Sequence, residues 1–231
     1  MSHDILFEFI GTAFLILLGG GVCANVSLKK TFGNRSGWIV ITFGWGFAVF
    51  VGAFIAAPYS GAHLNPALTL GLAITGSFSG NIAGYIIAQI LGAMTGACLV
   101  YLMYKPHFDA EESADTKLGV FATSPAIPHL FSNFLSEFIG TFVLVFAILM
   151  VGGAKMDGPY PVAILIVAIG MALGGTTGYA INPARDLGPR IVHALLPIKG
   201  KRDSNWRYAW LPVVAPICGA VAAGLLYLAV L

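Results

Sequence analysis

The tripeptide Asn-Pro-Ala occurs twice in this chain, as Asn65-Pro66-Ala67 and as Asn182-Pro183-Ala184, each time within an apolar stretch. Asn is a preferred N-cap residue and Pro suits the first helical position, so each copy predicts the N-terminus of a helix. Such an end leaves backbone N–H groups unpaired and carries a partial positive charge. Together with the Asn amides, the two ends are suited to donating hydrogen bonds to a solute oxygen and to repelling a cation.

The composition places these helix ends in a membrane. Of the 231 residues, 58% are hydrophobic and only 10% are charged, whereas a soluble domain averages about 25% charged residues. Inside a bilayer, helix N-termini are tolerated only where they line a polar cavity, so two of them predict a path through the protein. The net charge of +2 is too small to indicate a nucleic-acid partner. The three cysteines, an odd number, lie in apolar stretches and predict buried thiols, not disulfides; they are Cys23, Cys98 and Cys218.

Six apolar runs are predicted to cross the bilayer, a crossing that takes about 20 residues. They lie near residues 5–26, 38–57, 82–104, 134–151, 161–173 (extending toward 178) and 210–231. Two shorter apolar segments, 65–74 and 182–196, occupy matching places between the runs and predict re-entrant half-helices. The long polar stretch, residues 105–132, is expected to be a connecting loop.

The chain repeats itself. Glu8-Phe9-Ile10-Gly11-Thr12 recurs as Glu137-Phe138-Ile139-Gly140-Thr141, and each half carries one Asn-Pro-Ala motif. Small residues at four-residue spacing also recur, which favours close packing of helices in lipid; they are Ala88, Gly92 and Gly96 and then Ala215, Gly219 and Ala223. Residues 1–104 and 133–231 are therefore expected to be two repeats. Since each contains three spans, an odd number, the second is inverted relative to the first.

Three further polar residues lie in apolar surroundings. Glu8 and Glu137 occupy equivalent places, and we expect each carboxylate to accept hydrogen bonds from the irregular loop before a half-helix. A proton-relay role is the alternative. His63, just before the first motif, is a candidate pore-lining residue, with a structural role as its alternative.

The residues 60–67 (Ser-Gly-Ala-His-Leu-Asn-Pro-Ala) and 178–186 (Gly-Tyr-Ala-Ile-Asn-Pro-Ala-Arg-Asp) resemble the aquaporins, or major intrinsic proteins. Asp186 directly after Arg185 is typical of the glycerol facilitator branch, and a bacterial member is expected. The resemblance implies an all-α membrane bundle of six transmembrane helices and two half-helices with an inverted 3+3 repeat. It also implies a homotetramer in the cell membrane, with one pore per subunit and cytoplasmic termini.

Carried over by motif, the selectivity filter of such a channel is Trp45, Gly170, Tyr179 and Arg185. Gly170 is expected to leave space in the pore, with Trp45 and Tyr179 forming an apolar wedge and Arg185 donating from the other side. Asp186 is expected to support a loop. Tyr179 stands where glycerol facilitators usually have Phe. The resemblance implies no cofactor and no metal.

This filter predicts a passive channel for glycerol and other small neutral solutes, with some water permeability. Undissociated small acids such as lactic acid are expected to pass as well. The alternatives are a channel mainly for water and a proton-coupled secondary transporter, for which Glu8 and Glu137 are the candidate carboxylates. An enzyme is disfavoured because the five histidines are dispersed and no catalytic metal motif occurs.

The distribution of charge opposes the family orientation. All Lys and Arg residues except Lys155 fall in segments that the predicted topology places on one side of the membrane. The positive-inside rule would put that side in the cytoplasm and the termini outside. The resemblance puts the termini inside, and we follow it because the termini are too short to carry the charge bias.

Overall fold

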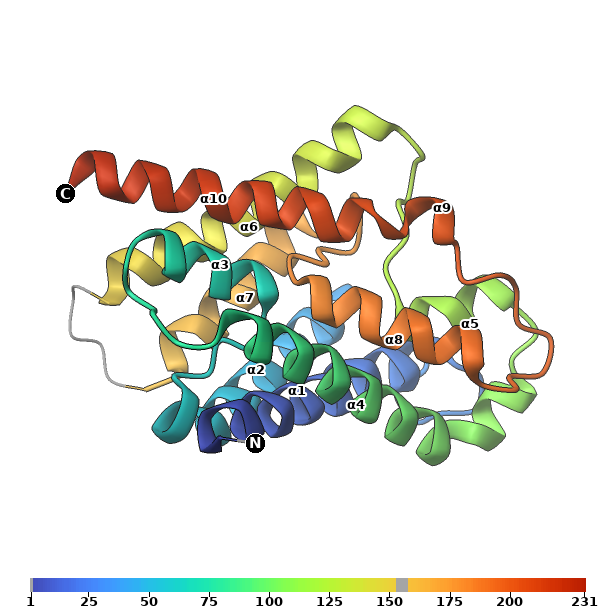
Figure 1. Ribbon diagram of the computed structural model, residues 1–231. Coiled ribbons are helices and arrows are strands. Elements are labelled where there is room, and N and C mark those ends of the chain that lie inside the picture. Colours follow the sequence, from blue (N-terminus) through green and yellow to red (C-terminus); the bar gives the residue numbers. More distant parts are fainter. Residues whose placement is uncertain (1, 153–157) are drawn as a thin grey trace.

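The computed structural model describes residues 2–152 and 158–231, and the described residues form helices and connecting loops without a strand (Figure 1). Lys155 lies outside the described residues. The helices are α1 (His3–Ser27), α2 (Trp38–Ser60), α3 (Pro66–Ile74), α4 (Ile82–Ala110), α5 (Ala114–Phe121), α6 (Leu130–Gly152), α7 (Tyr160–Leu173), α8 (Pro183–Leu195), α9 (Trp206–Ala209) and α10 (Leu211–Val230).

Five helical segments of the described chain are long and apolar enough to cross a membrane: α1, α2, α4, α6 and the combined α9–α10 segment. The sixth predicted span, α7, is apolar but has 14 residues, which corresponds to about 21 Å of helix. It is continued by the turn residues 174–177 before the loop to α8.

Two short helices, α3 and α8, lie between α4 and α10 (Figure 1). Each begins at the Pro of an Asn-Pro-Ala motif, with the preceding Asn as its N-cap. The Asn65 side chain accepts a hydrogen bond from the Ala67 N–H, and the Asn182 side chain accepts from the N–H groups of Ala184 and Arg185. The local capping chemistry thus determines where both helices begin.

The polar stretch 105–132 differs from the connecting loop that the sequence predicts. It holds the last residues of α4, the whole of α5 and the first residues of α6. Ser113 caps α5 by accepting from the Thr116 N–H, and Leu118, Val120 and Phe121 are buried on one face of the helix. Acidic residues make this stretch polar overall, so its short apolar face is not evident from composition.

Small residues bring the long helices together in pairs. Gly92 on α4 lies so close to α1 that an added Cβ would overlap the carbonyl oxygen of Phe9. Gly219 on α10 lies equally close to the carbonyl oxygen of Phe138 on α6. The same contact therefore recurs in both halves, as the repeated small residues predict.

We expect Gly92→Leu to lower the free energy of unfolding by about 1–3 kcal/mol, the usual cost of overpacking. The added side chain must push α1 away from α4. Gly21→Leu on α1 is the matched control, since a Cβ at Gly21 meets nothing within 4 Å. Thermal unfolding in detergent, followed by size-exclusion chromatography, compares the two. Equal midpoints for both variants would show that the α1–α4 contact does not require glycine.

Candidate functional site

Two cavities in the bundle share part of their lining. The first, of about 300 Å³, is lined by residues of both half-helix entrances, including His63, Asn65 and Asn182. The second, of about 720 Å³, is bordered by residues of α5 and of the loop after α8. Trp45, Tyr179 and Arg185 line both cavities. These side chains therefore lie between the two cavities, at a place called the constriction below.

The N-termini of the half-helices are tied to each other. The Asn65 Nδ2 atom donates to the Ile181 carbonyl oxygen at 2.9 Å, and the Asn182 Nδ2 atom donates to the Leu64 carbonyl oxygen at 2.8 Å. A side-chain amide carries two N–H groups, so this cross-link uses one from each Asn and leaves one for a solute. The two motifs thus hold the halves together and line the first cavity as well.

The backbone before each half-helix is strained in the same pattern. Ala62 and Leu64 have φ values of 53° and 51°, and Tyr179 and Ile181 have values of 38° and 43°. Side-chain-bearing residues rarely adopt this left-handed region, and they remain there only when the surrounding structure holds them. Both entrances therefore need an external constraint.

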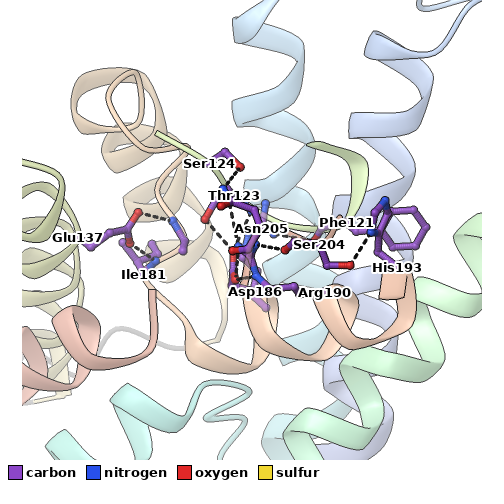
Figure 2. Close-up of polar contacts among 12 residues, drawn as sticks. Phe121, Thr123, Ser124, Glu137, Ile181, Asp186, Arg190, His193, Ser204 and Asn205 are labelled. Atoms are coloured by element: carbon purple, nitrogen blue, oxygen red, sulfur yellow. Dashed lines mark hydrogen bonds and ion pairs between the residues drawn. The ribbon is translucent and has the colours of Figure 1, made fainter. Parts of the chain in front are cut away.

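Two buried carboxylates supply that constraint. Glu8 accepts from the N–H groups of His63 at 2.9 Å and Leu64 at 2.7 Å. Glu137 accepts from the N–H groups of Ala180 at 2.9 Å and Ile181 at 2.8 Å (Figure 2). An ionised carboxylate makes strong hydrogen bonds to backbone N–H groups. Each glutamate therefore fixes the loop that leads into a half-helix.

His63 lines the first cavity and is held in place at the same time. Its Nδ1 atom lies 3.1 Å from Thr69 Oγ1, and its ring packs against Phe78 and Tyr85. Because the side chain is packed on several sides, it contributes a fixed wall to the cavity.

The Arg185 side chain does not lie across the pore from Trp45 and Tyr179, where the sequence predicts it. Its guanidinium carbon is 4.1 Å from the centroid of the Trp45 ring, so the group stacks on the indole and does not face it from across the pore. Its Nη1 atom donates to the Phe121 carbonyl oxygen at 3.4 Å. A planar guanidinium favours such stacking on an aromatic face.

Gly170 also differs from its expected role. It lines neither cavity, and a Cβ at this residue would lie 2.8 Å from Tyr179 Cζ and 2.9 Å from Tyr179 Oη. The space that Gly170 leaves is therefore filled by the phenol of Tyr179. Trp38 contacts both of these residues. Its Nε1 atom donates to the Gly170 carbonyl oxygen, and its ring packs edge-on against Tyr179.

A buried ion pair on α8 anchors the segment that holds Arg185 (Figure 2). Asp186 and Arg190 are fully buried, with the Arg190 Nη2 atom 2.7 Å from Asp186 Oδ1. Asp186 Oδ2 accepts from the Thr123 N–H and hydroxyl groups at 2.8 and 2.7 Å. Arg190 donates in turn to the carbonyl oxygens of Thr123 and Ser204. The pair therefore joins α8 to the residues that follow Phe121.

Arg190 is not among the site residues that the sequence predicts. Its four-residue spacing from Asp186 on a helix is the signal that could have identified the pair. Its partners Thr123 and Ser204 come from distant loops, and no local pattern marks them.

The second cavity is bordered by an ion pair. The Arg202 guanidinium contacts Asp115 on α5 and Asp203 in its own loop, and Arg202 and Asp115 both border the cavity. The hydrogen bond from Arg202 lowers the pKa of the Asp203 carboxyl. The neighbouring Lys201 donates to three carbonyl oxygens at the C-terminal end of α8, each at 2.7 Å. This loop is thus fixed to both α5 and α8.

Known proteins share the sequence of this chain over nearly its whole length. The family model described as "Major intrinsic protein" matches residues 1–227. The chain belongs to the major intrinsic protein family. Among its relatives, the glycerol uptake facilitator protein of Bacillus subtilis (strain 168) is 56% identical over 95% of this chain and 82% of that protein. The facilitator of Streptococcus pneumoniae (strain R6) is 53% identical over 98% of this chain and 99% of that protein.

A solved structure agrees with the sequence relatives. The X-ray structure of the aquaglyceroporin from Plasmodium falciparum superposes with a TM-score of 0.85 and 34% identity, covering 97% of this chain and 94% of that chain. The predicted all-α, aquaporin-like fold is confirmed, as is the resemblance to bacterial glycerol facilitators. This member of the major intrinsic protein family is a multi-pass membrane protein.

We expect Arg190→Ala to destabilise this family member by about 3–5 kcal/mol, because it leaves the Asp186 carboxylate buried without its partner. The double variant Asp186→Ala/Arg190→Ala should be less destabilised than the single variant Arg190→Ala, since it leaves no buried carboxylate without a partner. Arg207→Ala, at an exposed arginine, is the control. Unfolding by denaturant, followed by circular dichroism, measures the coupling. A double variant at least as unstable as Arg190→Ala would contradict an energetic coupling between the two side chains.

Proposed function

We propose that this protein is a passive membrane channel for glycerol and other small neutral solutes, with some permeability to water. The observation that carries the proposal is the constriction, where Trp45, Tyr179 and Arg185 line both cavities. The two aromatic rings offer hydrocarbon surface and the guanidinium offers hydrogen-bond donors. A polyol has a carbon backbone and hydroxyl groups, so it matches both kinds of surface.

The polar groups on the path favour a channel over a coupled transporter. Glu8 and Glu137 accept hydrogen bonds from the loops before the half-helices, which assigns their oxygens to holding the backbone. A proton-coupled transporter needs a carboxylate that gains and loses a proton during each cycle. The half-helix N-termini also oppose a cation at the centre of the path.

The assembly and orientation belong to the same proposal. We infer a homotetramer in the cell membrane with one pore per subunit and cytoplasmic termini, by resemblance to the family. We also infer that residues 1–104 and 133–231 are the inverted repeats, joined by 105–132. The equivalent hydrogen bonds of Glu8 and Glu137 support that division.

Stopped-flow light scattering on proteoliposomes tests the activity. We expect the purified protein to raise glycerol permeability well above that of empty liposomes, with glycerol reaching equal concentrations on both sides. The rate should not change when an uncoupler collapses the proton gradient, because no proton is coupled to transport. Water permeability without glycerol permeability would instead assign the protein to the water channels, and accumulation against a gradient would assign it to the coupled transporters.

Gly170→His separates the contribution of the constriction from that of the rest of the path. The imidazole must take the place that Tyr179 occupies beside Gly170 and so push the phenol into the pore. Glycerol flux is expected to be lost while water still passes. Parent-level glycerol flux in a folded variant would contradict the placement of Tyr179 at the constriction.

Small undissociated acids form a further group of expected solutes. A constriction that passes a three-carbon polyol also fits neutral lactic acid, whereas the lactate anion must lose its hydration to enter a path of low dielectric constant. Uptake of labelled lactic acid should therefore fall as the pH rises above the pKa of the acid. Uptake that is independent of pH would contradict passage of the neutral form.

A further inference from the structure

The Trp45 side chain is held by α1, which packs against α2 (Figure 1). Its Nε1 atom donates to Cys23 Sγ at 3.4 Å. A Cβ at Gly19 would overlap the six-membered ring of the same indole. Gly19 and Cys23 are four residues apart and so lie on one face of α1. The glycine lets the ring lie against the helix backbone, and the cysteine takes its N–H group.

Arg185 lies against the same ring, with its guanidinium carbon 4.1 Å from the ring centroid. Trp45 and Cys23 are both buried, and Cys23 borders the second cavity. The thiol therefore lies next to Trp45 at the constriction, on a helix that contributes no residue to the motif-derived filter.

The hydrogen bond to Cys23 changes what Trp45 offers to a solute. The indole N–H is a donor without any acceptor function, and a buried donor without a partner costs free energy. As long as Cys23 accepts it, the N–H is occupied and Trp45 presents only hydrocarbon to the path. Without that acceptor, the N–H would turn toward the permeating molecule, and the ring would leave its place under Arg185.

We propose that Cys23 is a positioning residue for Trp45 and thereby keeps the aromatic wall of the constriction apolar, which favours solutes with a hydrocarbon face over water. Gly19 also positions the ring, because it has no side chain that would displace the indole. The inference rests on the proposed function, because it concerns the preference of the same channel among neutral solutes.

The test measures the ratio of glycerol to water permeability in proteoliposomes, which does not depend on how many channels are folded. Cys23→Ala should lower this ratio roughly fivefold, the effect of losing one hydrogen bond. Cys23→Ser retains an acceptor and should stay within roughly twofold of the parent. Cys98→Ala and Cys218→Ala remove the other thiols, neither of which lines the two cavities described above, and should match the parent.

A second pair of variants tests whether the position of the indole matters, without altering the thiol. Gly19→Ala should also lower the ratio, because its methyl group must move the indole, whereas Gly21→Ala on the same helix meets nothing within 4 Å and should not. An unchanged ratio in both Cys23→Ala and Gly19→Ala overturns the inference, and so does a Cys23→Ser ratio equal to that of Cys23→Ala. A parent protein that does not conduct glycerol overturns the proposed function instead.

Discussion

The fold depends on one constraint: irregular backbone inside a hydrocarbon layer must have its hydrogen-bonding groups satisfied by the protein itself. The loops before α3 and α8 contain left-handed residues and cannot satisfy their N–H groups with a helical ladder. Glu8 and Glu137 accept from those N–H groups, and the Asn65 and Asn182 amides take one carbonyl oxygen from each loop. The path exists because these carboxylates and amides replace the water that such loops would otherwise need.

The two halves are equivalent in the groups that hold the half-helix entrances, and they differ at the constriction. Gly92 and Gly219 make the same backbone contact in each half, and the glutamates bond to equivalent N–H groups. The constriction has no such symmetry, since the residue after the first motif is Leu68 whereas the second motif is followed by Arg185. Only the second half also carries the Asp186–Arg190 pair, which is joined to the residues after α5. A duplicated scaffold thus holds one asymmetric set of residues at the constriction.

Local features of the chain are enough to predict most of the scaffold. Hydropathy marks the spans, because a membrane helix needs a long apolar run whatever its neighbours are. Asn-Pro-Ala marks the half-helix starts, because N-capping involves only adjacent residues, and α3 and α8 begin at Pro66 and Pro183. The helix α5 is the exception, because its few buried residues are hidden among acidic ones and its burial depends on the helices it covers.

The sequence by itself therefore determined the membrane fold, the repeat, the two half-helix entrances and the residue types near the constriction. Only the tertiary structure decided how those residues meet: the Tyr179 phenol fills the space beside Gly170, Arg185 stacks on Trp45, and the Trp45 N–H is taken by Cys23. These contacts join different helices and loops across long stretches of chain. Their geometry is set by how closely the helices pack, which no local pattern of residues encodes.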